Sequence, residues 1–514
     1  MEINNFNGIA PRFDDNLKPG YATTAENIDL SNGKIRPVSD DLLIEANTTS
    51  VNSIFYHSAT WYSGADKYYL SWRIGDYDLL IYLTAGVPYK TVGSVSAPLG
   101  QTRLVAPTLA DGGAGLLDDT YSYFITTTRS VGGYTDESGP SAVASITVAL
   151  KQVTVTAPTI SDSLVTFWNI YRISNSSGEY QFVAQVAAAT SSYTDNIIDA
   201  DLDTAPTVFY TSDQGNEITW DKPLIAFDGM ATDIESGLIM AWKDSTLYWN
   251  EPGYPDAWPS FYNMNFPSTI QRVIPFAGSW AIMTEKGPFR VDGTHPELLQ
   301  QSKVLGKEPC ISTAACLTSR GVAYESDSGI VLFNLIDTKV ITDSVFTEQW
   351  FKDNIDSDSA FMLENDNIIY LFHDDGILIG DSRVAPIIWT TSTIIATAAA
   401  VRKDLGELYF LDSAGITQLA GGSGSKTWTW QSGDLLQAGT GADTPVLGTE
   451  IIGSGTITAT VYVDDLEKKS KALDFAMYRN RRIFPPAYTF GRAAQVKLTG
   501  TGQVDEIIHG VTDA

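Results

Sequence analysis

The chain has 514 residues, of which 43% are hydrophobic, and its 61 Asp and Glu residues outnumber 33 Lys and Arg residues to give a net charge of −28. So negative a surface repels phosphate backbones, which argues against conventional nucleic-acid binding. No run approaches eighteen apolar residues, and Met1–Asn5 has neither the basic nor the apolar part of a signal peptide. We therefore expect a soluble protein that is made in a cytoplasm and has no membrane span.

A short hairpin pattern recurs along the chain at a nearly constant interval. In each unit, alternating apolar residues lead into a turn that contains Gly, Asp or Ser, and a second alternating run follows. The spacing from Ser245 to Gly287, and again from Gly287 to Gly329, is 42 residues. A period of roughly 40 to 50 residues with a hairpin in each unit is typical of β-propeller blades. The units predict six blades, with a seventh by inference, and they lie at Asn27–Val38, Leu70–Leu83, Ile239–Trp249, Ala281–Val291, Val322–Phe333, Ile368–Ile379 and Leu408–Leu419.

The large gap between Gly75 and Ser245 predicts a domain inserted at residues 98–206, which divides the propeller into residues 1–97 and 207–420. Some seven short alternating segments in the insert predict a β-sandwich. The insert resembles a fibronectin type III domain in four places, which are Tyr121–Phe124, Glu137–Ser141, Trp168–Arg172 and Tyr193–Asp195. Such modules are more often spacers than binding sites.

The last part of the chain, residues 421–514, changes character and predicts a small C-terminal β-domain. Ala420–Ser425 is typical of a flexible junction, and strands are expected at Thr427–Gln431, Thr456–Asp464, Ala494–Thr499 and Val504–His509. The full expectation is an all-β protein that combines a six- or seven-bladed propeller, a sandwich insert and this terminal domain.

A locally basic stretch stands out in this acidic chain. Residues 465–500 hold eight basic side chains against three acidic ones, and the basic ones are Lys468, Lys469, Lys471, Arg479, Arg481, Arg482, Arg492 and Lys497. They form either a solvated charged loop or a docking patch for an acidic neighbour, such as a second copy of the chain. As assembly residues we single out Arg479, Arg481 and Arg482.

Aromatic residues are dense between Trp242 and Phe266. Exposed rings that stack on sugars would make this segment a carbohydrate site, whereas buried rings would pack between blades and at a subunit contact, and packing is the favoured interpretation. Trp249, Tyr254 and Trp258 are therefore added to the assembly residues.

Motifs for catalysis or metal binding are incomplete. Ser425 stands where a phosphate loop needs Gly before Lys426, and the acidic run at Asp199–Asp203 lacks the Gly and Glu of a calcium loop. The four histidines are scattered singly, and no nucleophile elbow or sialidase-type turn is present. We expect no catalytic residue, no metal and no cofactor. Whether Cys310 and Cys316 are bonded is left open.

Three stretches together resemble phage tail proteins of the nozzle, or tail tubular B, type. They are the opening Asn5–Arg12 with Ala22–Gly33 and Ile35–Pro37, the segment Leu247–Pro259 with its Glu-Pro-Gly turn, and Gly491–Gly502. The resemblance implies a propeller-type virion protein of a short-tailed phage that is made in the host bacterial cytoplasm. Its copies form a ring, usually a hexamer, beneath the portal and its adaptor, and the ring continues the DNA-ejection channel.

The partners that the resemblance implies are other copies of the chain, adaptor and portal-proximal proteins, and tail fibre or spike proteins. DNA would pass through without specific binding, which an acidic channel wall would favour. Two alternatives remain: a tail receptor-binding protein, or adhesin, that recognises host surface glycans, and a propeller glycosidase whose acids come from separate blades.

Overall fold

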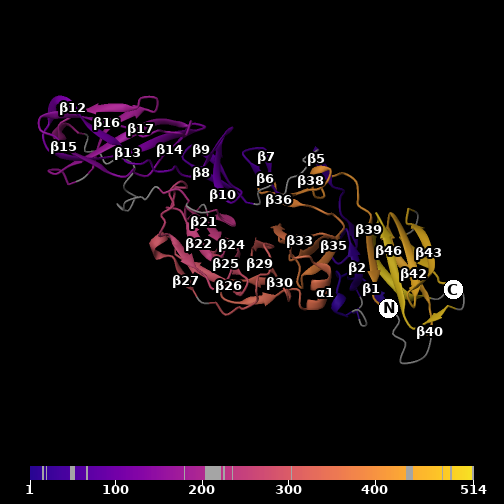
Figure 1. Ribbon diagram of the computed structural model, residues 1–514. Coiled ribbons are helices and arrows are strands. Elements are labelled where there is room, and N and C mark those ends of the chain that lie inside the picture. The colour runs from indigo at the N-terminus through magenta and orange to yellow at the C-terminus, as the bar shows by residue number, and fades with distance from the viewer. Residues whose placement is uncertain are drawn as a thin grey trace. The chain divides into compact units, whose positions relative to one another are not determined.

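The computed structural model describes residues 1–514 apart from 14–16, 19, 47–52, 65–67, 179, 203–220, 224–225, 234, 294, 303, 436–443, 477–478, 487–488 and 512–514. It confirms the all-β class, because strands account for nearly all of its regular structure (Figure 1). The helical elements are α1 (Glu348–Asn354) and the short 3-10 turns η1 (Pro11–Phe13), η2 (Asp199–Asp201) and η3 (Pro296–Leu298). The chain divides into two compact units: unit 1 contains Met1–Ala65, Trp280–Arg290 and Ser302–Ala514, and unit 2 contains Asp66–Ser279 and Val291–Gln301.

Propeller-type blades are built as sheets of four antiparallel strands. One sheet contains β8 (Tyr69–Ile74), β9 (Tyr77–Thr84), β10 (Val87–Val92) and β11 (Val95–Pro98), and the next contains β20 (Gly229–Asp233), β21 (Leu238–Lys243), β22 (Thr246–Trp249) and β23 (Asn263–Asn265). Two more follow the same plan: β24 (Ile270–Phe276), β25 (Ser279–Thr284), β26 (Gly287–Asp292) and β27 (Gln300–Ser302); and β28 (Ala315–Thr318), β29 (Gly321–Ser326), β30 (Gly329–Phe333) and β31 (Thr338–Val340). The next blade, β32 (Phe361–Asn365), β33 (Ile368–His373), β34 (Gly376–Asp381) and β35 (Ile388–Ser392), forms the first four strands of a nine-stranded sheet.

A sixth sheet takes its outer strand from the N-terminal part of the chain. In it, β36 (Ala398–Arg402), β37 (Glu407–Leu411) and β38 (Gly415–Gln418) are followed by β5 (Leu42–Ala46), which pairs antiparallel with β38. The strands β6 (Ser53–His57) and β7 (Thr60–Gly64) form a separate hairpin. Five of the seven predicted hairpins thus lie in four-stranded sheets, and a sixth, Ile368–Ile379, lies in the first four strands of the nine-stranded sheet.

Glycines end the predicted hairpin turns because the close approach of the next strand leaves no room for a side chain. Gly376 has a φ of +147°, and a Cβ there would lie 2.1 Å from the carbonyl oxygen of Ser392. Gly415 has a φ of +140°, and its Cβ would lie 2.0 Å from the carbonyl oxygen of Glu45. Only glycine tolerates both constraints at these two turns.

The first predicted hairpin, Asn27–Val38, is not a blade. Its strands β3 (Ile28–Asp29) and β4 (Arg36–Pro37) form a two-stranded sheet, and Ile35 pairs with Val504 near the C-terminus. The preceding strands also pair far along the chain: β1 (Glu2–Ile3) pairs with β47 (Gln503–Val511), and β2 (Ala22–Glu26) lies between β35 and β39 (Trp428–Ser432). The expectation that residues 1–97 are all propeller is therefore corrected for the opening segment.

The C-terminal domain continues the sheet that β2 extends. From β39 the sheet runs through β46 (Ala494–Gly500) and β42 (Thr456–Val463) to β43 (Leu466–Asp474). A second sheet joins β1 and β47 to β41 (Gly448–Ser454) and β44 (Asn480–Ile483), and β40 (Thr444–Pro445) pairs with β45 (Phe490–Gly491). All four predicted strands are present, whereas β41, β43 and β44 were not predicted.

The junction predicted to be flexible, Ala420–Ser425, is fixed by hydrogen bonds. The amide of Gly422 donates to the carbonyl oxygen of Asp40 at 2.7 Å, and the amide of Asp40 donates to the carbonyl oxygen of Gly424 at 3.1 Å. The glycines permit this close approach, because a Cβ on Gly424 would lie 2.0 Å from a carboxylate oxygen of Asp40. Composition alone cannot distinguish this contact from a flexible linker.

The insert is a β-sandwich within unit 2. One sheet contains β12 (Thr108–Leu117), β16 (Lys151–Thr156) and β19 (Ser192–Asp195); the other contains β13 (Thr120–Val131), β14 (Tyr134–Glu137), β15 (Ala144–Thr147), β17 (Val165–Ser174) and β18 (Gln181–Ala187). The consecutive strands β12 and β13 lie in different sheets, whereas the first two strands of an immunoglobulin constant-type sandwich share one. The predicted end of the insert near residue 206 lies outside the described residues.

Candidate functional site

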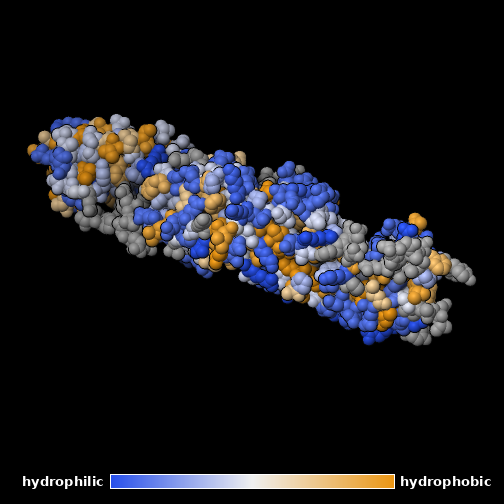
Figure 2. Space-filling model, turned by 90° about the horizontal axis from the view of Figure 1, so that it is seen from below, coloured by the Kyte–Doolittle hydropathy of each residue, from blue (hydrophilic) through white to orange (hydrophobic). Residues whose placement is uncertain are grey.

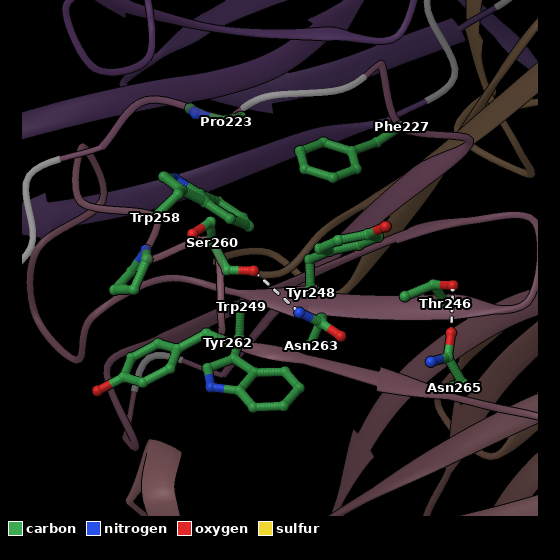
Figure 3. Close-up of a pocket in the computed structure, with 11 residues that line it drawn as sticks. Pro223, Phe227, Thr246, Tyr248, Trp249, Trp258, Ser260, Tyr262, Asn263 and Asn265 are labelled. Atoms are coloured by element: carbon green, nitrogen blue, oxygen red, sulfur yellow. Dashed lines mark hydrogen bonds between the residues drawn. The ribbon is translucent and has the colours of Figure 1, made fainter. Parts of the chain in front are cut away.

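A pocket of about 300 Å³ lies in unit 2 beside β22 and β23 (Figure 3). Its aromatic lining comes from Phe227, Tyr248, Trp249, Trp258 and Tyr262. The polar side chains that line it are Thr246, Ser260, Asn263 and Asn265, and Pro223 and Pro259 complete it. Every lining side chain is uncharged, although the chain as a whole is strongly acidic.

The aromatic walls are held by packing of one ring on another. The Phe227 ring lies 5.7 Å from that of Tyr248 and 5.5 Å from that of Trp258, both tilted. Trp249 and Tyr262 stack with an interplanar angle of 20°. Rings that pack in this way have little rotational freedom, so the shape of the pocket is largely fixed in advance.

The polar rim depends on the register of β22 and β23. Thr246 pairs with Asn265 and Tyr248 pairs with Asn263, so these side chains share one face of the sheet. The Thr246 hydroxyl donates to Oδ1 of Asn265 at 2.7 Å, and Nδ2 of Asn263 donates to the carbonyl oxygen of Ser260 at 2.9 Å. These bonds set the orientation of both amides. Figure 3 shows Oδ1 of Asn263 and Nδ2 of Asn265 turned toward one another.

The loop that carries Trp258 is held by a buried carboxylate. Asp256 accepts hydrogen bonds from Nζ of Lys90 at 2.7 Å and from the amide of Gly100 at 2.7 Å. The hydroxyl of Tyr134, on β14 of the sandwich, also donates to Asp256 at 3.1 Å. Burial alone would raise the pKa of Asp256, but Lys90 and these hydrogen bonds hold it below its ordinary value.

A second carboxylate completes this buried network. Asp136 on β14 forms ion pairs with Lys90 on β10 and with Arg129 on β13, where Nη2 of Arg129 lies 2.6 Å from the carboxylate. The side chains of Lys90, Asp136 and Asp256 are fully buried, and that of Arg129 is 2% exposed. Ions buried this deeply persist only when they are paired, so the network fixes how the sandwich meets the blade of β8–β11.

The aromatic assembly residues lie mostly inside unit 2. Trp249 and Trp258 are each 4% exposed, and the Trp258 indole nitrogen donates to the carbonyl oxygen of Pro255 at 2.8 Å. Such burial does not fit a contact with another subunit, so the expectation is corrected for these two residues. Tyr254 is half-buried, and the exposed aromatic residue of this segment is Phe261, at 65%.

The three arginines belong to unit 1, where partners in their own domain hold them. Arg479 pairs with Asp505 at 2.9 Å and Arg482 with Glu450 at 2.8 Å, while Nε of Arg481 donates to the carbonyl oxygen of Asp474. The side chain of Arg479 is still 80% exposed. Lys468, Lys469 and Lys471 of the same basic stretch lie on β43, at the end of the sheet, and Lys497 lies on β46.

The predicted site and the structural pocket overlap only in part. The aromatic density from Trp242 to Phe266 indicated the right segment, but Asn263 and Asn265 were missed. The signal for them is the alternation Asn263-Met264-Asn265, which places both amides on one face of a short strand. The buried partners Lys90 and Asp256 are 166 residues apart, and nothing local in the sequence links them.

In the described parts of the chain, no three or more His, Cys, Asp or Glu residues are grouped so that they could hold a metal ion. The same residues include no helix that is long and apolar enough to cross a membrane. Cys310 and Cys316 are both buried, and the Cys310 sulfur donates to the carbonyl oxygen of Ser312 at 3.2 Å.

No protein-family model and no curated protein sequence matches the chain. Solved structures that resemble it include an exo-β-1,3-galactanase from Phanerochaete chrysosporium with galactose, at 9% identity over 86% of this chain and 95% of that chain, with a TM-score of 0.18. Apo AztD from Citrobacter koseri is 8% identical over 77% of this chain and all of that chain, with a TM-score of 0.25. PorZ, a surface component of the type-IX secretion system of Porphyromonas gingivalis, is 11% identical over 97% of this chain and 82% of that chain, with a TM-score of 0.26. Because these scores are low, the description of the chain as all-β with propeller-type blades rests on its own sheet topology.

Proposed function

We propose that the chain is a structural subunit of a short-tailed phage tail, of the nozzle type, and that its copies form a ring around the DNA-ejection channel. The proposal starts from the three stretches that resemble this family. What supports it most is that the first and third of these stretches lie in one sheet of unit 1, on either side of β39, although they are separated by most of the sequence. There, β39 pairs with β2 on one side and with β46 on the other.

The residues of the opening stretch have structural roles. Phe6 is fully buried and its ring meets that of Trp430 edge-on at 5.3 Å. A Cβ on Gly8 would lie 1.8 Å from the carbonyl oxygen of Trp389, so this position admits only glycine. The amide of Ile9 donates to the same carbonyl oxygen at 2.8 Å. This stretch connects a blade to the C-terminal domain, which suits a structural subunit.

The nine-stranded sheet of unit 1 adds a mechanical argument. It runs from β32 through β35, β2 and β39 to β43 without a break in its strand pairing. Main-chain pairing therefore connects the blade to the terminal domain, through one parallel pair between β2 and β35, Glu26 with Thr391, and four antiparallel pairs between β2 and β39. This continuity favours a structural role over that of a mobile enzyme domain.

Charge supports both the ring and the channel. The edge strand β43 exposes Lys469 and Lys471 on a chain whose net charge is −28, which suits contact with an acidic surface of the next copy. Exposed acids on blade turns, such as Asp244, Asp327 and Asp374, suit a wall along which DNA slides. Hydrophilic residues cover much of the face in Figure 2, with scattered apolar patches.

Charge reversal on β43 tests the proposed assembly. The triple variant Lys468→Glu, Lys469→Glu, Lys471→Glu should lower the yield of infectious particles at least tenfold when it replaces the natural chain. A matched control carries Lys286→Glu, Lys339→Glu and Lys403→Glu, which change the net charge equally at exposed positions on blades. Equal particle yields from the two triple variants, with both folded, would contradict a role of β43 in ring contacts.

A further inference from the structure

The pocket beside β22 and β23 has features that a purely structural contact does not need. Its lining carries no charge, whereas 61 acids occupy the rest of the chain. An uncharged lining does not select a cation or an anion by ion pairing. Its volume of about 300 Å³ lies at the small end of the range for ligand sites.

The two amides at the rim form a matched donor and acceptor. Because Oδ1 of Asn265 accepts from Thr246, its Nδ2 is the end presented to the pocket as a donor. Because Nδ2 of Asn263 donates to Ser260, its Oδ1 is presented as an acceptor. A hydroxyl group both donates and accepts, so one or two neighbouring hydroxyls satisfy this pair.

The aromatic wall supplies the other half of the recognition. Tyr248 is half-buried on the same sheet face as the two amides, and the Phe227 ring, which also lines the pocket, lies 5.7 Å from the Tyr248 ring. A hydroxyl-rich ligand with an apolar face, such as a sugar ring, packs that face on an aromatic ring while its hydroxyls reach polar groups at the edge. A purely apolar ligand would leave both amides unsatisfied, which costs binding energy.

The side chains of the pocket are also held in place before a ligand binds. Thr246 and Ser260 fix the amides, and Asp256 fixes the loop that carries Trp258 through Lys90 and the amide of Gly100. Little side-chain freedom is lost on binding, so even a small neutral ligand retains usable affinity.

We propose that this pocket binds one or two rings of a neutral saccharide, with Asn263 and Asn265 on its hydroxyls and Tyr248 against its ring face. The proposal does not depend on ring assembly or on a place in a phage tail. Asn263, Asn265 and Tyr248 act here as binding residues, and no bond in the sugar is broken.

Titration of the full chain with methyl glycosides of glucose, galactose and mannose, and with lactose and maltose, tests this site. Glucuronate and glucosamine serve as charged counterparts. Ligand-observed NMR and intrinsic tryptophan fluorescence should detect binding of at least one neutral sugar, with a dissociation constant of about 1 mM. Absence of binding by all neutral sugars, or stronger binding of the charged ones, overturns the proposal.

Single substitutions at the two amides locate the binding. Asn265→Asp keeps the acceptor for Thr246 and removes the donor, and Asn263→Ala removes the acceptor; each should weaken binding by about tenfold. Asn365→Ala, at a half-buried position on β32, is the matched control and should bind like the natural chain. Unchanged affinity in both pocket variants would place the sugar elsewhere and contradict the proposal, and thermal unfolding of each variant shows that it is folded.

Discussion

The C-terminal domain of unit 1 and the junction of sandwich and blade in unit 2 are both well buried, but by opposite means. The first is apolar: Trp428, Trp430, Ile451, Val496 and Leu498 are fully buried there. The second is ionic, with Lys90, Arg129, Asp136 and Asp256 buried together. Apolar burial is non-directional and tolerates repacking, whereas buried ions demand particular partners. The comparison teaches that the insert is joined to its blade by specific ionic partners, while the terminal domain is held mainly by its core.

Removal of the shared cation should have the largest effect. Lys90→Met keeps most of the side-chain volume but leaves Asp136 and Asp256 buried without their common partner. We expect a loss of about 3–5 kcal/mol in the local unfolding free energy at β10 and β14. Hydrogen exchange on the full chain measures this loss.

The control for Lys90 is Lys222→Met, an exposed lysine whose Nζ donates to Thr102 at 2.9 Å. It should change local stability by no more than about 0.5 kcal/mol. If Lys90→Met were as mild as its control, the ionic network would not be what holds the junction, and the contrast with the terminal domain would fail.

Lowering the pH from 7 to 5 should stabilise the sandwich. Glu137 accepts hydrogen bonds from Thr126, Asn169 and Tyr171, and burial raises its pKa to about 7. Between about pH 4.5 and pH 7, Glu137 is protonated in the folded state but ionised in the unfolded state. Stability therefore falls as the pH rises from about 4.5 to 7. We expect β13 and β17 to gain roughly 2–3 kcal/mol from pH 7 to pH 5.

Glu137→Gln should abolish most of that gain and should raise stability at pH 7, because the amide needs no proton. Asp118→Asn, at an exposed position of the same sandwich, should leave the pH profile unchanged. The pKa of Asp256 is lowered, so its carboxylate stays ionised between pH 5 and pH 7. A flat profile in the natural chain would show that Glu137 is ionised normally.

Lowering the pH from 7 to 5 should destabilise the terminal domain, and the loss there should be smaller than the gain in the sandwich. His509 is 4% exposed, its Nδ1 lies 2.9 Å from the Thr449 hydroxyl, and burial lowers its pKa to about 4. Below about pH 6.5 His509 binds a proton in the unfolded state, whereas in the folded state it stays neutral until about pH 4. Stability therefore falls as the pH drops from about 6.5 to 4. We expect β41 and β47 to lose about 2 kcal/mol by pH 5.

His509→Gln should remove this dependence, and His295→Gln in unit 2 is the matched control. If the stability of the sandwich and that of the terminal domain changed in the same direction with pH, the proposed difference between the two regions would be contradicted. Opposite signs would sharpen it, because each region would then report its own buried group.

Local patterns made much of the fold predictable. The hairpins are encoded by alternation and by turn glycines such as Gly376, and six of the seven predicted hairpins lie in blades, five of them as four-stranded sheets and one within the nine-stranded sheet. The pairing of β2 with β39 could not be predicted, because the partners are about 400 residues apart and no local rule joins them. Lys90 was missed for another reason: a lone lysine is ordinarily exposed, and only the assembled network explains its burial.

The proposed role in a phage tail is tested most directly by electron cryo-microscopy of tails from a phage whose genome encodes this chain, with mass spectrometry of the same particles. The account predicts the chain in a closed ring below the portal and adaptor, present in a fixed copy number, with acids facing the channel. Absence of the chain from the particles, or its presence only at the tips of tail fibres, would contradict the account.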